Sequence, residues 1–472
     1  MMEWLALLMF ICVCLVLLAG YPVAFSLAGT ALIFAAIGVA TGDLHPALLK
    51  SAFSRLFGIM QNPTLIAVPL FVFMGVMLEK AKIAEKLLTG MAGLFAGTPG
   101  GLAISVVLVG ALLAASTGIV GATVVTMGLL SLPVMLKSNY STPLSTGVIC
   151  ASGTLGQIIP PSIVLVLLGD VIASANRDAG IGGDPVSVGD LFAGAMLPGI
   201  LLVVLYIIYI AIYARVKPDD APAVAKGIKQ LSELQENTSQ SETMESSSAP
   251  ASTNGFELSS LLLPLILILL VLGSILAGIA TPSEAAALGA IGATLLAIYY
   301  REFSLERLKQ VVRSTTKTSS MVFMILIGAS IFSLVFRAFE GDDAIREILS
   351  GLPGGVFGAM VVVMLSMFLL GFILDFIEIV FVVVPLTAPA LLAMGVDPIW
   401  LGIMIAVNLQ TSFLTPPFGF ALFYLRGVTP PDIATAEIYR GVLPFIFIQM
   451  AVLIIMAVWP EIVTWLPSII YK

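Results

Sequence analysis

Apolar runs close to the length of a bilayer crossing recur along almost the whole chain. A transmembrane helix needs about 20 mostly apolar residues, and runs near this length lie at 4–19, 23–40, 191–214, 261–278 and 442–458. Only 10% of the 472 residues are charged, whereas soluble domains carry roughly 25%. The sequence therefore predicts an all-α polytopic membrane protein rather than a soluble domain with one anchor.

Residues and motifs that the sequence lacks exclude several classes of function. The only histidine is His45, so an H-E-x-x-H zinc site is excluded, and neither a G-x-S-x-G motif nor a G-x-x-x-x-G-K-[ST] phosphate loop occurs. Cys12, Cys14 and Cys150 lie in apolar stretches and indicate neither a disulfide framework nor a metal site. We therefore expect a transporter and not an enzyme, with no cofactor and no nucleic-acid partner.

The two ends of the chain repeat each other around a polar middle segment. Residues 215–257 are rich in Ser, Thr and Glu, which predicts a disordered cytoplasmic linker. Pro160-Pro161 in "GTLGQIIPPSIVLVLLG" recurs as Pro416-Pro417 in "LQTSFLTPPFGFALFYLRG". Pro133 and Pro389 are separated by the same number of residues as these two pairs. The matching positions indicate an internal repeat.

Charge placement indicates how the two repeats are oriented. Basic residues favour the cytoplasmic side of a membrane. The loop after the third full span of the first half carries Lys80, Lys82 and Lys86, whereas the equivalent loop at 340–347 is mostly acidic. Opposite bias in equivalent loops predicts an inverted-topology repeat, as in many secondary transporters. The groups that we assign to the cytoplasmic side are Arg215, Lys217, Arg301, Arg307, Lys309, Arg313 and Lys317.

Each full span moves the chain to the other side of the membrane, so counting spans from these cytoplasmic groups places both termini outside. The first apolar run is interpreted as a spanning helix, because no Lys or Arg precedes it and no A-x-A-like cleavage site follows. Each repeat is predicted to hold spans, an interfacial arm, a re-entrant hairpin and a broken helix. The first repeat, 1–214, has its arm at 44–60, its hairpin at 101–136 and its broken helix at 142–175. The second repeat, 258–472, has its arm at 303–317, its hairpin at 355–395 and its broken helix at 397–425.

The two Pro-Pro pairs lie inside apolar segments and are expected to break each helix, because proline lacks an N–H and clashes with the preceding turn. Freed backbone groups are tolerated in a membrane only where they line a cavity or are buried in protein. They offer carbonyls to a cation and N–H groups to an anion. The alternative is a proline kink satisfied by neighbouring helices. The residues expected to line a substrate site are Pro160, Pro161, Gln410, Pro416 and Pro417.

Small or polar residues mark the expected tip of each hairpin. The first tip reads "ASTGIVGATV", which suits either an ion site or close packing of small residues. The second tip carries Asp375, a carboxylate that is costly at mid-membrane depth. It either ligates a cation or caps a helix. Glu284, two residues after Pro282, is interpreted as a structural cap at a helix start.

These segments resemble the large membrane subunit, of the DctM type, of tripartite ATP-independent periplasmic (TRAP) transporters. The resemblance spans both halves and covers nearly all of the chain except 216–257. The matching strings are "STGIVGATVVTMGLLSLPVML", "SGTLGQIIPPSIVLVLLGD", "LFAGAMLPG", "GIATPSEAAALGA", "GFILD" and "NLQTSFLTPPFGFALF".

The resemblance implies an elevator-type transporter in a bacterial inner membrane, with both termini in the periplasm and with uptake of small organic acids coupled to sodium. It also implies two protein partners, a small four-helix membrane subunit of the DctQ type and a periplasmic substrate-binding protein. The alternative is a stand-alone sodium/carboxylate symporter of the same superfamily. The implied sodium sites, where tips meet broken helices, are Ser116, Thr117, Gly118, Gly153, Thr154, Gly156, Gln157, Gly371, Asp375, Asn408, Thr411 and Thr415.

Overall fold

The structure, a computed structural model, describes residues 2–95, 97–117, 120–180, 186–223 and 258–471, with side chains except at 2–3, 49, 84, 114–117 and 258–261. Most of these residues lie in helices, and the described ranges contain no strand, which confirms the all-α prediction. Six described helices are long and apolar enough to cross a membrane, or up to nine spans if each bent pair counts once. Large apolar side chains such as Trp4, Phe25 and Phe447 remain exposed, as lipid-facing helices require.

The first half contains two spans, a bent arm and span, a helix pair and a broken helix. Its elements are α1 (Met2–Leu18), α2 (Val23–Thr41), α3 (Leu48–Gln61), η1 (Thr64–Ile66), α4 (Ala67–Lys80), α5 (Ile83–Leu94), α6 (Gly101–Thr117), α7 (Val120–Lys137), α8 (Thr142–Thr154), η2 (Leu155–Gln157), α9 (Ile163–Asp178) and α10 (Val188–Val216). Helix α3 lies in the predicted arm 44–60 and meets the η1–α4 span at a bend of 57°. Helix α5, after the basic loop, was not anticipated from the sequence.

The second half has a similar order with one clear difference. Its elements are α12 (Leu258–Leu276), α13 (Pro282–Tyr299), α14 (Leu305–Ala338), α15 (Gly341–Ser350), α16 (Gly355–Leu370), α17 (Phe376–Val382), α18 (Val384–Ala393), α19 (Pro398–Leu414), α20 (Phe420–Val428), α21 (Thr435–Val458) and α22 (Glu461–Ile470). The predicted arm 303–317 is the first part of α14, which continues straight into the next span. Residues 305–327 contain neither proline nor glycine, whereas Pro63 lies at the bend of the first half.

The beginning of the predicted linker 215–257 is part of the packed structure. Helix α10 extends to Val216, and Ala221 is fully buried. The carbonyl oxygens of Asp220 and Ala221 accept hydrogen bonds from the backbone N–H groups of Ser141 (2.9 Å) and Gly100 (2.9 Å). Residues 215–223 therefore hold the ends of the first hairpin. Residues 224–257 lie outside the described part of the chain.

Local capping explains where several helices begin. Thr281 accepts a hydrogen bond from the N–H of Glu284, whose carboxylate accepts one from the Thr281 N–H (2.8 Å), so these residues form a capping box at the start of α13. Ser187 and Asp190 form the same arrangement at the start of α10. Each box satisfies backbone donors that the first turn leaves unpaired. Glu284 thus has the structural role that the sequence suggested.

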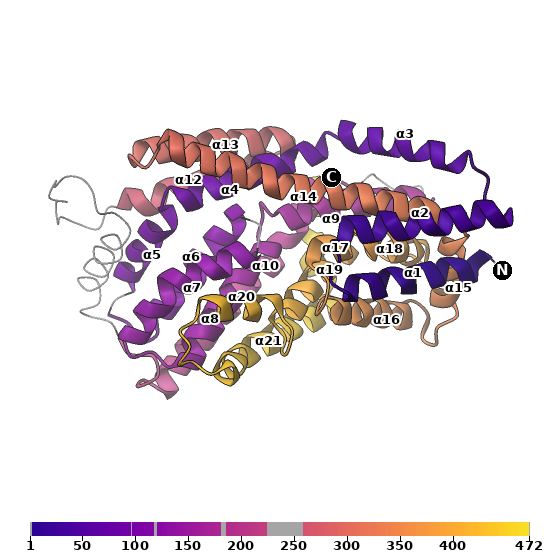
Figure 1. Cartoon of the computed structure of the whole chain (residues 1–472). Helices are drawn as coiled ribbons and strands as arrows, with labels where there is room; N and C mark the ends of the chain where they lie inside the picture. Colours follow the sequence, from indigo (N-terminus) through magenta and orange to yellow (C-terminus); the bar gives the residue numbers. More distant parts are fainter. Residues whose placement is uncertain (1, 96, 118–119, 181–185, 224–257, 472) are drawn as a thin grey trace.

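The helices form a frame and a central group. In the frame, α14 packs against α2 and α4, and α4 also packs against α13. The central group consists of the broken helices and the hairpins, which pack against one another. Helix α7 contacts both α8 and α20, and α18 contacts α9, so each hairpin touches broken helices of both halves. In Figure 1 the first helix pair (α6, α7) and the second hairpin (α16, α18) lie toward opposite ends of the molecule. This arrangement brings the two helix breaks to the middle.

Small residues allow the closest contact within the central group. A Cβ atom on Gly147 of α8 would lie 2.1 Å from the carbonyl oxygen of Gly441 of α21, so only glycine fits there. Close backbone approach replaces the hydrophobic driving force that lipid does not supply. The contact fixes α8, which leads into the first break, against α21.

Candidate functional site

A cavity of about 70 Å³ lies where the hairpins and the broken helices meet. It is lined by residues of α4, α7, η2, α9, α14, α17, α19 and α20, and so by both halves. Among the described lining residues, Asp375 is the only charged one, and Gln157 and Thr318 add polar groups. A water molecule occupies about 30 Å³ of liquid, so this central cavity has room for an ion with a water but not for an organic acid.

Asp375 lies at the tip of the second hairpin, between α16 and α17. It is the N-cap residue of α17: its Oδ1 accepts a hydrogen bond from the Phe376 N–H (2.7 Å), and the Glu378 carboxylate accepts one from the Asp375 N–H (3.0 Å). The helix-cap alternative for Asp375 is therefore observed. Its carboxylate also lines the central cavity, so capping leaves it accessible to a bound ion.

The first break is closed. Thr154 ends α8, Gly156 and Gln157 lie in the 3-10 turn η2, and all three are buried. Pro160 and Pro161, joined by a cis peptide bond, are also buried. Gln157 lines the central cavity, and within the described part of the chain its Oε1 has no hydrogen-bond partner. The first break therefore contributes Gln157, whose amide oxygen is unpaired, to the same cavity that Asp375 lines.

The second break is more open. Pro416 and Pro417 are also joined by a cis peptide bond, but Pro417 is exposed and Phe418 keeps 67% of its surface accessible. Thr415 is the C-cap residue of α19, and its hydroxyl donates to the Thr411 carbonyl oxygen (2.8 Å). The Thr411 hydroxyl likewise donates within α19, to Val407 (2.8 Å). Neither threonine lines the central cavity.

Two side chains of α19 connect it to the second hairpin. The Asn408 amide donates to the Met364 carbonyl oxygen (2.8 Å), and the Ser412 hydroxyl donates to the Phe368 carbonyl oxygen (2.6 Å). Gly371, which ends α16, lies so close that an added Cβ would be 2.5 Å from the Ser412 Oγ. Asn408 and Gly371 thus join α16 to α19 and do not face the cavity.

The first hairpin approaches its broken helix in a similar way. An added Cβ on Gly153 of α8 would lie 2.3 Å from the Val124 Cγ2 of α7. Ser116 and Thr117 are the last residues of α6, with side chains outside the described part, and Gly118 lies outside the described residues. Gly121 lies against the Tyr424 ring of α20 and lines the central cavity.

Thr154 and Gln410 meet directly. The Gln410 Nε2 donates to the Thr154 Oγ1 (3.4 Å), and the two residues are 256 positions apart, the separation that also relates the Pro-Pro pairs. Gln449 of α21 donates to the same oxygen (3.4 Å) and to the Tyr206 hydroxyl of α10 (2.8 Å). Sequence reasoning missed Gln449 and Tyr206; a lone amide within the apolar run "FIFIQMAVL" was the available signal for Gln449.

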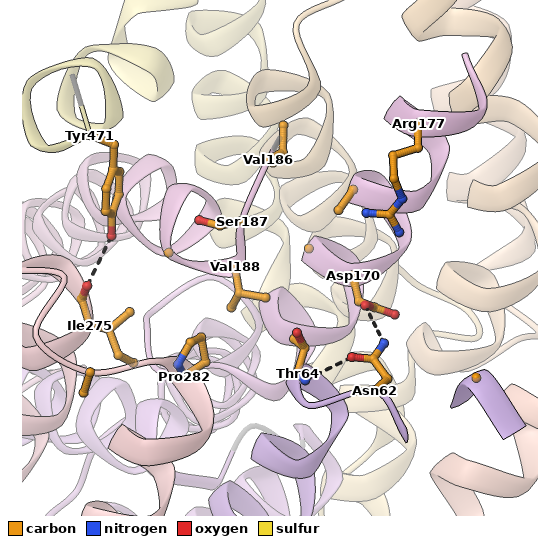
Figure 2. Close-up of a pocket in the computed structure, with 15 residues that line it drawn as sticks. Asn62, Thr64, Asp170, Arg177, Val186, Ser187, Val188, Ile275, Pro282 and Tyr471 are labelled. Carbon is orange, nitrogen blue, oxygen red and sulfur yellow. Dashed lines mark hydrogen bonds between the residues drawn. The ribbon is translucent and has the colours of Figure 1, made fainter. Parts of the chain in front are cut away.

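A second, larger cavity of about 570 Å³ opens at another place, shown in Figure 2. There Asn62, after α3, donates to Asp170 of α9 (2.8 Å) and accepts from the Thr64 N–H (3.0 Å), while Arg177 lies farther along α9. Tyr471 lines the opposite side, and its burial, with the nearby Asp190 carboxylate, raises the pKa of its phenol.

An ion pair between Arg337 and Asp178 lines a neighbouring cavity of about 390 Å³ that shares Asn62 and Asp170 with the first. Arg337 of α14 pairs with Asp178 of α9 (2.6 Å) and with Asp342 of α15 (3.2 Å). We call these two cavities the outer cavities, because the predicted topology puts helix α3, which lines both of them, on the outside. Together, the outer cavities lie between α9 of the central group and the helices α3 and α14.

Comparison with known proteins identifies the family of this chain. Residues 10–462 match the family described as "Tripartite ATP-independent periplasmic transporter, DctM component". The C4-dicarboxylate TRAP transporter large permease protein DctM of Pseudomonas aeruginosa is 30% identical over 90% of each chain. The isethionate TRAP transporter permease protein DctMQ of Oleidesulfovibrio alaskensis is 28% identical over 95% of this chain and 64% of its own.

A solved structure shares the fold. The YdaH transporter of Alcanivorax borkumensis aligns with a TM-score of 0.61 at 14% identity, over 97% of this chain and 98% of its own. At that identity the likeness concerns the fold alone. The family match, the related sequences and the helical bundle agree, and they exclude the enzyme alternative. The chain belongs to the DctM family and is a TRAP transporter large permease subunit.

Proposed function

We propose that this subunit imports small organic acids, coupled to sodium ions, through the central cavity between the second hairpin tip and the first helix break. One observation carries the proposal: Asp375 and Gln157, from opposite halves of the chain, line the same cavity. An acidic tip and an unpaired amide oxygen on the same cavity offer a cation oxygen ligands from different repeats. Hard cations prefer oxygen ligands of this kind.

The charge of the second tip supports a cation there. Asp375 and Glu378 lie close together, and among the described residues neither forms an ion pair. A carboxylate at the centre of a bilayer costs about 2.5–3.5 kcal/mol on insertion scales, and Asp375 is exposed at the hairpin tip and not enclosed by protein. A bound sodium ion offsets that cost, and it also lowers the repulsion that an arriving carboxylate substrate meets.

The remaining proposed ligands fall into groups by their surroundings. Gln157 and Asp375 face the cavity, whereas Asn408, Thr411 and Thr415 donate their polar hydrogens to backbone carbonyls. Their hydroxyl or amide oxygens still offer lone pairs to a cation. The other proposed contributors are Ser116, Thr117, Gly118, Gly153, Thr154, Gly156 and Gly371, through backbone carbonyls at the breaks and tips and, at Ser116 and Thr117, also through hydroxyls.

Organic acids are the proposed substrates because the related permeases are named for C4-dicarboxylate and isethionate, both small organic anions. The N-terminal end of α9 supports an anion, since Ile163 and Val164 of its first turn line the cavity. A helix N-terminus carries partial positive charge. The cavity is too small for such an acid in this conformation, so uptake requires the lining to move, and the elevator motion of the central group past α4 and α14 supplies that movement.

Two protein partners and an orientation complete the proposal. A periplasmic binding protein delivers the acid, and a small four-helix subunit of the DctQ type binds the frame in the bacterial inner membrane. The relative named DctMQ, of which this chain covers 64%, supports a partner of this kind. Both termini are proposed to be periplasmic, on the side of the outer cavities, where the Tyr471 hydroxyl donates to the Ile275 carbonyl oxygen (3.3 Å).

Reconstitution in liposomes tests the proposal. The chain is reconstituted with its small partner subunit, and uptake of a labelled organic acid is measured with an inward sodium gradient, a proton gradient, or neither, each with and without the binding protein. We expect uptake only with sodium and the binding protein together. Uptake by the chain alone at the same rate would establish the stand-alone symporter, and uptake driven by protons alone would refute sodium coupling.

A further inference from the structure

A cluster of four buried polar side chains lies at the centre of the molecule, one from each of four helices. Thr154 (α8), Tyr206 (α10), Gln410 (α19) and Gln449 (α21) each have 0% of their surface exposed. Gln449 is the hub, because its Nε2 contacts both the Tyr206 hydroxyl (2.8 Å) and the Thr154 Oγ1 (3.4 Å). We call these four residues the central polar cluster.

The cluster joins equivalent points of the two broken helices. Thr154 and Gln410 are related by the separation of 256 residues, and each precedes its Pro-Pro pair by the same number of residues. The hydroxyl of Thr154 donates to the Ala151 carbonyl oxygen (2.9 Å) and accepts from both glutamine amides. A hydroxyl offers one donor and two acceptor sites, so the Thr154 hydroxyl is fully used.

Stability alone does not explain these side chains. In the described structure the Oε1 atoms of Gln410 and Gln449 are buried without a hydrogen-bond partner. An unsatisfied buried acceptor is unfavourable, and replacing both partners of a buried hydrogen bond by apolar groups is often nearly neutral. Leucine or phenylalanine would therefore serve packing as well, as Phe445 does where its ring meets Tyr206 edge-on at 5.1 Å.

We propose that Gln449, held in place by Tyr206, is a positioning residue that keeps the two helix breaks in register and thereby couples sodium binding at one break to sodium binding at the other. The inference rests on the proposed sodium-coupled function. Gln449 acts through Thr154 and Gln410 and touches neither the central cavity nor the hairpin tips. Without the Gln449 side chain, the proposed sodium sites at the two breaks bind sodium independently of each other.

The test uses the reconstituted transporter and follows uptake as a function of sodium concentration. Gln449→Leu and Tyr206→Phe each remove one partner of the 2.8 Å bond and are expected to raise the half-saturating sodium concentration about threefold to tenfold, the range of one hydrogen bond. The steepness of the sodium curve is expected to fall toward that of independent sites. The maximal rate should change less than the half-saturating concentration. Met456→Leu, equally buried on α21, is the matched control and should leave the curve unchanged.

The double variant Tyr206→Phe/Gln449→Leu separates positioning from stability. Removing both partners should restore thermal stability close to wild type, because neither side of the 2.8 Å hydrogen bond is left unpaired, while the sodium curve stays shifted. If the curve recovers together with stability, or if the single variants keep the wild-type curve, the inference is wrong. A wild-type curve that is not steep also overturns it. A wild-type protein whose uptake needs no sodium contradicts the proposed function instead.

Discussion

The two helix breaks carry the same Pro-Pro pair and the same cis peptide bond, yet they differ in exposure. The first break is closed, with Ile158 fully buried and Pro161 buried, whereas at the second break Pro417 is exposed and Phe418 is 67% exposed. Equivalent sequence therefore has two environments within one molecule. Alternating access in inverted-repeat transporters moves one repeat or bundle against the other. In this conformation the first break is buried and the second is exposed.

The hairpin tips differ as well. The second tip holds Asp375 and Glu378, whereas the first tip, "ASTGIVGATV", has no acid. The first tip can bind a cation only through neutral oxygens, and the second adds a full charge. Similar folding in the two halves thus accompanies unequal electrostatics, and the two sites should not contribute equally to sodium affinity.

The largest expected effect comes from removing the charge of the second tip. Asp375→Asn should raise the half-saturating sodium concentration for uptake at least about tenfold, because a carboxylate ligand is replaced by a neutral one. Asparagine caps helices as well as aspartate does, so the α17 cap and the amount of folded protein should be retained. Asp397→Asn, the exposed cap of α19, is the control. An unchanged sodium response in Asp375→Asn would exclude this tip as a sodium site.

The exposure difference predicts unequal thiol labelling. In a protein in which Cys12, Cys14 and Cys150 are replaced, Phe418→Cys should react with a membrane-permeant thiol reagent at least about ten times faster than Ile158→Cys, because a buried thiol is inert. Mass spectrometry of the labelled protein gives both rates. Adding sodium and substrate should bring the two labelling rates closer together, because the proposed transport cycle exposes the first break and buries the second. Equal rates without ligands would contradict the asymmetry between the breaks.

Replacing a tightly packed glycine by alanine should lower the stability of the protein more in the first half than in the second. Gly153→Ala places a methyl group 2.3 Å from Val124 Cγ2, a clash of carbon against carbon, and should destabilise the protein by about 1–3 kcal/mol. Gly371→Ala places its methyl group 2.5 Å from the Ser412 Oγ and 3.0 Å from the Ser412 Cβ; the hydroxyl can rotate away at the loss of one hydrogen bond, about 1 kcal/mol, and the Cβ must shift slightly. Thermal unfolding in detergent should rank them in that order. Gly29→Ala, with no neighbour within 4 Å, is the control; the reverse ranking would contradict the packing described.

The smallest expected effect comes from neutralising the glutamate of a capping box, and it should differ between the boxes of α13 and α17. Glu284 and Glu378 both cap a helix start, but only Glu378 lies beside the acidic tip. Because Gln serves in a capping box as Glu does, Glu284→Gln should change neither the sodium response nor, beyond about 0.5 kcal/mol, stability. Glu378→Gln should shift the sodium curve measurably, though less than Asp375→Asn. Identical curves for the two variants would show that Glu378 acts only as a cap.

Much of the architecture could be predicted from the sequence because its signals are local. Apolar runs set the spans, each Pro-Pro pair interrupts a helix, and the "DFIE" string contains the capping box of α17. The family resemblance was also confirmed, since its motifs are distributed over both halves. The continuity of α14 was missed, although the absence of proline and glycine from 305–327 was available as a signal.

The contacts between distant segments could not be predicted. Gln449 and Tyr206 are 243 residues apart and meet only because α10 and α21 pack together. A single amide in an apolar run does not reveal its partner. Likewise, Arg337 of α14 and Asp178 of α9 are 159 residues apart, and only the fold makes them an ion pair. Whether a break is open or closed also depends on packing, since both carry the same motif.

The most direct test of the central claim is equilibrium binding of radioactive sodium to the purified protein, measured without any substrate or gradient. We expect saturable binding that excess unlabelled sodium displaces and potassium does not. Asp375→Asn should bind much less sodium at the same concentration, because the second tip loses its charge. Equal binding by wild type and Asp375→Asn, or no saturable binding by the wild type, would contradict a sodium site between the second hairpin tip and the first helix break.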